Sequence, residues 1–176
     1  MPFVDPFVLG DHLFVEQMGA KPTYIIHRTI HLPESRFSSF YAFKNVNPAN
    51  ARPEALTRDL RRESKILEFL ESPGIPRMHS FGVVQNCGYM ISEYIWGKSL
   101  LHVLRELAAY QRMLSADYAL HIASEACRVL ENAHLQSGPD FPNGVIHGGL
   151  GPRNIILAYT GEVYVLGFGA PMLEIT

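Results

Sequence analysis

Cysteine, tryptophan and charge are all scarce in this sequence. Of its 176 residues, two are cysteines, Cys87 and Cys127, and one is tryptophan. Two thiols cannot staple a small secreted scaffold, so we expect a reducing compartment and two ordinary core cysteines. The 15 Lys and Arg nearly balance the 17 Asp and Glu, leaving a formal net charge of −2. Such a chain has no basic field for a nucleic-acid backbone, and we expect no nucleic-acid partner.

Long apolar runs are missing as well. No stretch approaches the ~20 apolar residues that cross a bilayer, and the first ten residues lack a basic region and contain Pro2 and Pro6. We therefore expect no membrane partner and a cytoplasmic location. Apolar residues in short runs are abundant, at 47% of the chain, which is enough for one domain or two small packed lobes.

The first half of the chain has the pattern of a sheet with one helix. Apolar, β-branched and aromatic runs lie between turn-prone residues and predict antiparallel strands. These runs are 13–15, 24–26, 40–43, 81–84 and 89–95, with a turn at 85–88. A leucine-rich stretch over 54–71 has helical spacing and ends at Pro73-Gly74. We predict a five-stranded antiparallel sheet with one helix between the third and fourth strands.

The second half has mainly helical patterns. Apolar residues recur at i, i+3 and i+4 over 99–110 and 116–135, which predicts two helices. A loop over 137–144 follows, and the short runs 145–146, 155–157 and 163–166 predict strands or loop edges. The change of pattern falls at Trp96-Gly97-Lys98. We therefore divide the chain into 1–95 and 96–176 and expect an α+β fold.

Five short motifs with charged, histidine, asparagine or glycine residues occur along the chain in a fixed order. Lys44 closes the run Tyr41-Ala42-Phe43-Lys44, Glu63 lies on the predicted helix, and Glu93-Tyr94-Ile95 precedes the link. His147-Gly148-Gly149-Leu150-Gly151-Pro152-Arg153-Asn154 and Gly167-Phe168-Gly169 follow. Together these segments resemble the protein kinase family, in particular the bacterial serine/threonine kinases. The resemblance implies a sheet-rich N-lobe over 1–95 and a truncated, mainly helical C-lobe over 96–176.

The resemblance also implies roles for single residues. Lys44 would contact the phosphates of a nucleotide and pair with Glu63. The backbone from Glu93 to Ile95 would meet the base, and Asn154 would lie beside the phosphates. If a nucleotide binds, these are the residues that would hold it.

Two positions that are central to phosphoryl transfer in this family are glycine here. Gly149 stands where the family has the base that accepts the substrate proton, and Gly167 stands where it has the metal-binding Asp. Gly148 and Gly151 replace an arginine and a lysine of the same loop. The neutral amide of Asn154 alone is a poor site for Mg²⁺. We therefore predict no catalysis and no metal site. The histidines other than His147 also lack enough neighbouring ligands to bind a metal ion.

The residues that would hold a nucleotide are compatible with binding and with a purely structural role. Gly19 matches the first glycine of the phosphate-covering loop, but Lys21 and Tyr24 stand at the second and third. These side chains could fill the phosphate site, or Lys21 could bring a charge to it. The Lys44 and Glu63 pair could bind ATP without magnesium, or it could only tether helix to sheet as a partly exposed pair worth about 0–1 kcal/mol.

The expected partner surface is the long helix. The sequence ends soon after Gly169, so the family's activation segment and later helices are absent from it. Apolar residues around the helix Ala116–Leu135, including Ala126 and Val129, would then need another cover. We expect a second copy or a different protein to bind this helix together with the region from Val163 to Thr176.

The prediction is thus an inactive kinase-like module that acts by protein interaction. One alternative is a nucleotide-sensing module that binds ATP without turnover. The other is a phosphotransferase of the aminoglycoside or choline kinase type, whose catalytic loop matches His147-Gly148 better. That family also requires an Asp where Gly149 stands. His147 itself is expected to be structural and packed against Phe168.

Overall fold

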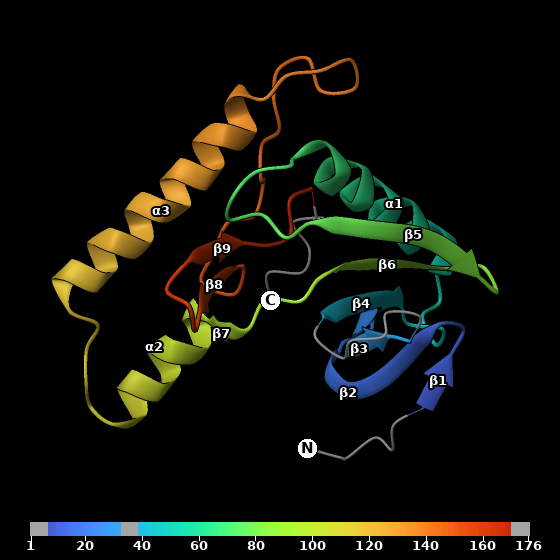
Figure 1. The fold of residues 1–176 in the computed structure, drawn as a ribbon, viewed down its shortest axis with the longest axis horizontal. Coiled ribbons are helices and arrows are strands. Elements are labelled where there is room, and N and C mark those ends of the chain that lie inside the picture. Colours follow the sequence, from blue (N-terminus) through green and yellow to red (C-terminus); the bar gives the residue numbers. More distant parts are fainter. Residues whose placement is uncertain (1–6, 33–38, 170–176) are drawn as a thin grey trace. The chain divides into compact units, whose positions relative to one another are not determined.

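The computed structural model describes residues 7–32 and 39–169 (Figure 1). The chain divides into two compact units, one of residues 1–65 with 77–94 and one of residues 66–76 with 95–176. The second unit thus includes the end of the first helix and the loop after it, in addition to the residues from Ile95 onward. The segment Glu93-Tyr94-Ile95, called the hinge motif below, contains this boundary. Each unit has its own sheet.

A six-stranded antiparallel sheet forms the first unit. Its strand order is β1-β2-β3-β4-β6-β5. The strands are β1 (Phe7–Leu9), β2 (His12–Ala20), β3 (Tyr24–His31), β4 (Phe40–Val46), β5 (Met78–Val84) and β6 (Cys87–Glu93). The predicted α+β fold is confirmed, but the strand count was one short, because β1 pairs with the start of β2 at the edge of the sheet.

Tight turns set the register of this sheet. Lys21 donates its backbone N–H to the carbonyl of Tyr24 at 2.8 Å, which closes the β2–β3 hairpin. Gln85 and Asn86 have φ of 48° and 65°, as a two-residue turn of mirror-image type requires. The predicted turn was two residues too long, since Cys87 and Gly88 already belong to β6.

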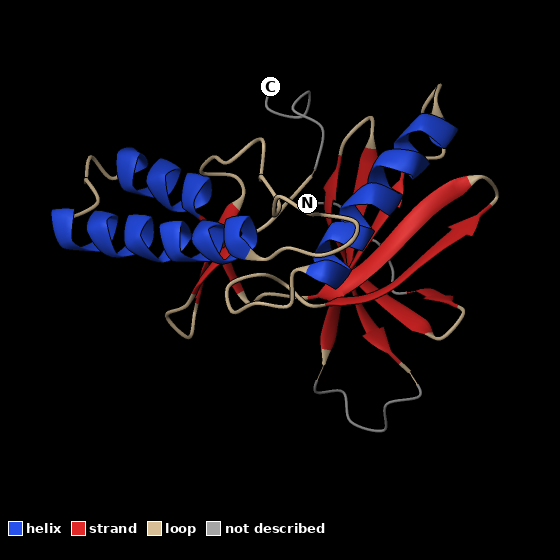
Figure 2. Ribbon diagram, turned by 90° about the horizontal axis from the view of Figure 1, so that it is seen from above, coloured by secondary structure: helices blue, strands red, loops and turns tan. Residues whose placement is uncertain are grey.

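Helix α1 (Pro53–Phe69) confirms the predicted amphipathic helix, and it lies against one face of the sheet (Figure 2). Leu60 of α1 and Val46 of β4 are fully buried. Thr57 accepts a hydrogen bond from the backbone of Gly88 in β6 at 2.8 Å. These contacts fix α1 beside the strands that carry the hinge motif and Lys44.

The opposite face of the sheet is aromatic. Phe14, Tyr41, Phe43 and Ile91 form a buried cluster. His27 lies edge-on to Phe14, with their ring centroids 5.2 Å apart. The alternation of side chains along each strand therefore separates this aromatic face from the face that carries Lys44.

Two helices and a three-stranded sheet form most of the second unit. The helices α2 (Leu100–Ala109) and α3 (Ala116–Leu135) confirm the prediction, and Ser99 and Ser115 cap their N-termini. The sheet has the order β7-β8-β9. Its strands are β7 (Gly97–Ser99), β8 (Ile155–Ala158) and β9 (Val163–Val165).

One prediction for this unit was wrong, and one alternative that the sequence left open is decided. The segment interpreted as a link forms β7, in which Gly97 pairs with Ala158. Val145 and Ile146 form no strand, because the Val145 amide donates to the carbonyl of Ala133 near the end of α3.

One face of α3 is buried within the second unit. Ala126 and Val129 lie on it, so they are not part of the bare surface expected for this helix. Gly74 packs here with a φ of 83°, and a Cβ at this position would meet the Val129 side chain. The Gly74 carbonyl accepts from the backbone of Val165 at 2.8 Å. The loop after α1 is thus held between α3 and β9.

The two thiols have different environments. Cys87 at the start of β6 is partly buried, whereas Cys127 on α3 is exposed. The expectation of two core cysteines was therefore wrong for Cys127. Within residues 7–32 and 39–169, no helix has the length and apolar character that a bilayer span requires.

Candidate functional site

Lys44 and Glu63 form a largely buried ion pair in the first unit. The Lys44 Nζ lies 2.8 Å from Glu63 Oε2, between the middle of the sheet and α1. The side chains are only 17% and 7% exposed. The pair is therefore less exposed than the sequence suggested, with Glu63 buried and Lys44 partly buried. Removing one partner of a buried pair costs about 3–5 kcal/mol, because a charge is left without compensation.

Tyr24 covers the same ammonium group. The Lys44 Nζ lies 4.5 Å from the centroid of the Tyr24 ring. Tyr24 is buried, and its hydroxyl donates to the Leu56 carbonyl of α1 at 3.3 Å. Lys21, by contrast, is exposed. The third glycine position of the phosphate-covering loop is thus filled by an aromatic ring that packs onto Lys44.

The hinge motif is tied into the sheet. Glu93 donates its amide to the Arg77 carbonyl at 2.8 Å, and Arg77 donates its own amide to the Glu93 carboxylate at 3.2 Å. The Tyr94 amide lies 3.4 Å from the Phe40 carbonyl. The first unit ends at Tyr94, and Ile95 begins the continuation of the second. The amides of Glu93 and Tyr94 are therefore committed to protein partners.

A cluster that was not predicted from the sequence lies on the Lys44 side of the sheet. We call it the arginine cluster, and it consists of Arg28, Glu16, Phe40 and Tyr94. The guanidinium of Arg28 is 3.0 Å from the Glu16 carboxylate. It also lies 5.2 Å and 5.7 Å from the ring centroids of Phe40 and Tyr94. One signal was available in the sequence, since Arg28 interrupts a strand in which every second residue is aromatic or aliphatic.

His147 anchors the glycine-rich loop of the second unit. It is buried, and its Nε2 lies 2.9 Å from the Leu166 carbonyl. The Gly149 amide donates to Nδ1 at 3.2 Å, so the proton of the neutral ring is on Nε2. The predicted contact with Phe168 is present, with a centroid separation of 4.7 Å. Both ring nitrogens are therefore used to hold the loop.

Asn154 closes the same loop. Its side-chain amide donates to the Gly149 carbonyl at 2.9 Å, and its backbone amide donates to the Gly151 carbonyl at 2.9 Å. Its own carbonyl accepts from Leu166 at 2.7 Å, which ties the loop to the segment that leads into Gly167. The structure thus brings Asn154 together with Gly149, a contact that was not predicted from the sequence.

The two loops contain no acid. Residues 147–154 and 163–169 include neither Asp nor Glu. Throughout the part of the chain that the structure describes, no three His, Cys, Asp or Glu side chains come together as a metal site. The hydrogen bonds of His147 and Asn154 hold residues 147–154, and the positions at which the resemblance implies a proton acceptor and a metal-binding Asp are Gly149 and Gly167.

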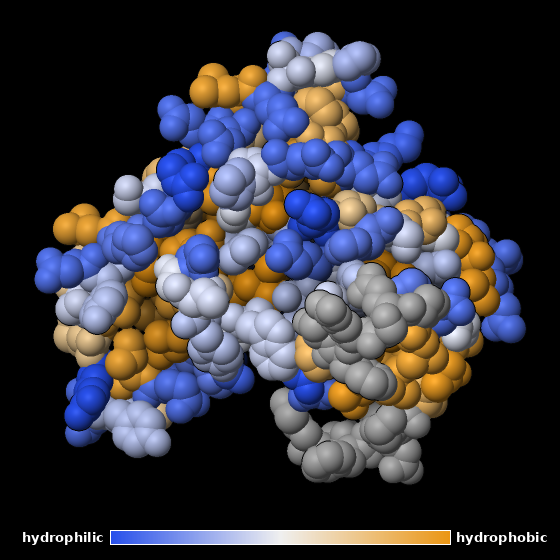
Figure 3. Space-filling model, in the orientation of Figure 1, coloured by the Kyte–Doolittle hydropathy of each residue, from blue (hydrophilic) through white to orange (hydrophobic). Residues whose placement is uncertain are grey.

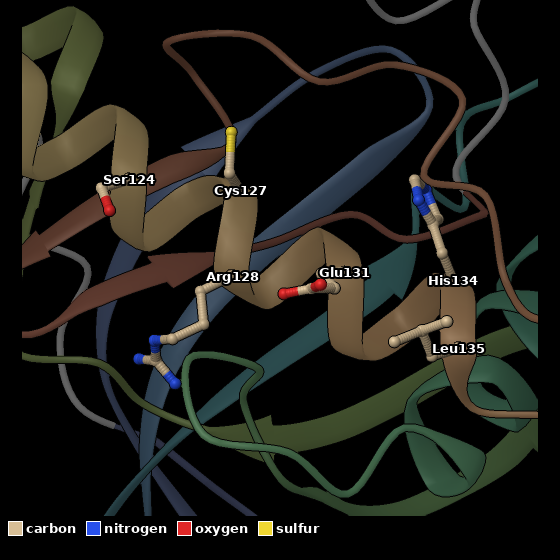
Figure 4. Close-up of a pocket in the computed structure, with 6 residues that line it drawn as sticks. All are labelled: Ser124, Cys127, Arg128, Glu131, His134 and Leu135. Atoms are coloured by element: carbon tan, nitrogen blue, oxygen red, sulfur yellow. The ribbon is translucent and has the colours of Figure 1, made fainter.

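A shallow hollow lies on the outer side of α3 (Figure 4). It is lined by Ser124, Cys127, Arg128, Glu131, His134 and Leu135. Arg128 forms an exposed ion pair with Glu125 one turn away, and its hydrogen bond lowers the pKa of that carboxyl. None of the residues named for nucleotide binding lines this hollow.

The profile of the protein kinase domain family, described as "Protein kinase domain", matches residues 30–173. The chain therefore belongs to the protein kinase domain family. It is 24% identical over 175 residues, 99% of its length, to "Tyrosine-protein kinase MasK" of Myxococcus xanthus. It is 30% identical over 122 residues, 66% of its length, to "Serine/threonine-protein kinase PknA" of Mycobacterium tuberculosis.

Solved structures show the same fold. The Mycobacterium tuberculosis PknI kinase domain, as a C20A mutant, superposes with a TM-score of 0.74 at 19% identity and covers 97% of this chain. The apo form of PpkA-294 gives a TM-score of 0.77 at 14% identity over 93% of this chain. The chain spans about a quarter of MasK and PknA, and 64% and 60% of the two solved chains. It thus covers only part of a kinase domain.

Proposed function

We propose that this chain is a catalytically inactive kinase-like module that acts by binding a protein partner. The observation that carries the proposal is glycine at both catalytic positions, Gly149 and Gly167, within an otherwise well-formed loop. Phosphoryl transfer in this family depends on positioning and on neutralising charge with metal ions. A loop without its base and its metal-binding acid does neither.

The size of the loss supports an inactive domain. Removing a single preorganised catalytic group commonly costs two or more orders of magnitude in rate. Here the base and the metal ligand are both replaced, and Gly148 and Gly151 replace two cations. His147 does not substitute for the base, because both of its ring nitrogens hold the loop.

A phosphate-transfer assay tests this proposal. Purified protein is incubated with radiolabelled ATP and Mg²⁺, alone, with a generic protein acceptor and with small-molecule acceptors such as choline and aminoglycosides. We expect no labelled product above that of a Lys44→Ala variant. Incorporation by the wild type that disappears in Lys44→Ala would show an active enzyme and end the proposal.

We place the partner surface on the outer face of α3. Leu120 and Leu135 lie there and are 70% and 74% exposed, on the side opposite Val129. In Figure 3 apolar side chains gather between α2 and α3, and the outer edge of α3 carries both apolar and hydrophilic side chains. Val163 is buried within the second unit, and residues 170–176 lie outside the described residues. The proposed surface is therefore narrower than the predicted one and is carried by α3.

Light scattering across a dilution series tests the α3 surface. If α3 is covered by a second copy, the wild type associates at micromolar concentration and a Leu120→Glu/Leu135→Glu variant is monomeric. Tyr159→Glu is the matched control, because Tyr159 is similarly exposed but lies at the turn after β8. If the wild type is monomeric at every concentration and the variants scatter light in the same way, self-association through α3 is excluded.

The intact Lys44–Glu63 pair favours a second function, nucleotide binding without magnesium. Titration with a fluorescent ATP analogue in EDTA and in Mg²⁺ tests it directly. A metal-independent site gives the same affinity in both buffers and loses it in Lys44→Ala. Binding that requires Mg²⁺ would instead favour an enzyme. Binding that is unchanged in Lys44→Ala would show that the nucleotide binds elsewhere.

A further inference from the structure

The arginine cluster joins four separate segments of the first unit. Glu16 comes from β2, Arg28 from β3, Phe40 from β4, and Tyr94 from the residue after β6. The guanidinium contacts the Glu16 carboxylate and both aromatic rings. A planar cation that is paired with a carboxylate and lies over two rings is held in one orientation. Arg28 is therefore a fixed part of this surface.

Strand register puts the cluster on the same face as Lys44. Ile26 pairs with Lys44, and Arg28 pairs with Ala42. Because side chains alternate along a strand, Phe40, Ala42 and Lys44 project from one face of β4. Arg28 projects from that face as well, and its head group lies at the Phe40 end.

The separation along β4 matches the reach of a nucleotide. Phe40 and Lys44 are four residues apart, or about 13 Å at ~3.3 Å per residue. Phosphates held at Lys44 would therefore leave the base near Phe40 and the hinge residue Tyr94, whose amide meets the Phe40 carbonyl. Ala42, between the two ends, has the smallest side chain on that face of β4.

We propose that Arg28 is a specificity-determining residue that keeps purine bases off this face. Its guanidinium occupies the surface of Phe40 and Tyr94 on which a base would stack, while the phosphate end at Lys44 keeps its charge. The surface then favours a polyphosphate over a nucleoside. This inference rests on the proposed nucleotide surface and names what that surface selects.

Calorimetric titrations in EDTA with two half-ligands test the inference. Adenosine reports on the base end, and inorganic tripolyphosphate reports on the phosphate end. Arg28→Val, which suits a strand, should raise the affinity for adenosine at least tenfold and should not raise that for tripolyphosphate. Glu16→Gln keeps the arginine but removes its carboxylate, and should raise adenosine affinity by a smaller factor.

The outcomes separate this inference from the nucleotide proposal. Equal adenosine affinity in wild type and Arg28→Val, including no binding to either, would overturn the role of Arg28. A loss of tripolyphosphate affinity in Arg28→Val without a gain for adenosine would also overturn it, because Arg28 would then be a phosphate ligand. Loss of tripolyphosphate binding in Lys44→Ala tests the phosphate end separately. If Arg28→Val does not fold, Arg28→Gln, a flat uncharged side chain, must show the same gain.

Discussion

Replacing Glu63 with leucine should destabilise the chain by about 3 kcal/mol, because the Lys44 ammonium would be left without its carboxylate in a buried place. The present contact is 2.8 Å long, and the two side chains are 17% and 7% exposed. The cost lies at the lower end of the usual range, since the residual exposure of Lys44 and the Tyr24 ring both soften the loss.

The magnitude matters because domains of this kind are marginally stable. A loss of 3 kcal/mol is a large share of the ~5–15 kcal/mol by which a typical domain is folded. In urea, at a slope of ~2 kcal/mol per M, it would lower the midpoint of unfolding by roughly 1.5 M. The double variant Lys44→Met/Glu63→Leu removes both charges together and should recover most of the loss.

Urea unfolding followed by far-UV circular dichroism measures these changes. Glu125→Leu is the matched control, because it removes the exposed Arg128–Glu125 pair on α3. That pair is in contact with water, so its removal should leave the midpoint unchanged. If Glu63→Leu lowered the midpoint no more than Glu125→Leu, or if the double variant were no better than the single one, the pair would not be a buried structural element.

Two further predictions concern pH and backbone strain. Burial lowers the pKa of His27 from 6.5, so the unfolded chain takes up this proton first as the pH falls. Stability should therefore decline below about pH 6.5 until the lower folded-state pKa is passed. The variant His27→Phe should reduce this decline, measured as the urea midpoint between about pH 7 and 5. An unchanged decline would exclude His27 as the cause of the pH dependence. Gly74→Ala should lower the free energy of unfolding by at least ~2 kcal/mol, because φ is positive and the new Cβ would clash with Val129. Gly10→Ala, where φ is also positive but the space is open, should lower it by only ~1 kcal/mol. Equal losses in the two variants would contradict the packing at Gly74.

The sequence predicted those helices and strands whose signals come from residues that are neighbours in the chain. The helix Ala116–Leu135 has the predicted bounds, because its apolar period and its Ser115 cap are both read from neighbouring residues. Strand β7 could not be predicted in this way. It forms because Gly97–Ser99 pairs with residues 156–158, almost 60 residues later, and nothing in its own three residues signals a strand.

The candidate site was predictable where a motif carries it. The order of Lys44, Glu63 and Asn154 indicated their family positions, and the structure forms the Lys44–Glu63 pair. Burial of that pair was not predictable, because it depends on how Tyr24 packs against α1. The contacts of Arg28 were missed for the same reason, since they join four segments that are distant in sequence.

The position of the two thiols has a practical consequence for spectroscopy. Cys87 belongs to the first unit and Cys127 to the second, and the sequence contains no other cysteine. A donor and an acceptor dye can therefore be attached to the native chain, and the exposed Cys127 should react first. Energy transfer between the two dyes would then report whether the distance between the two units changes when ATP or a partner is added.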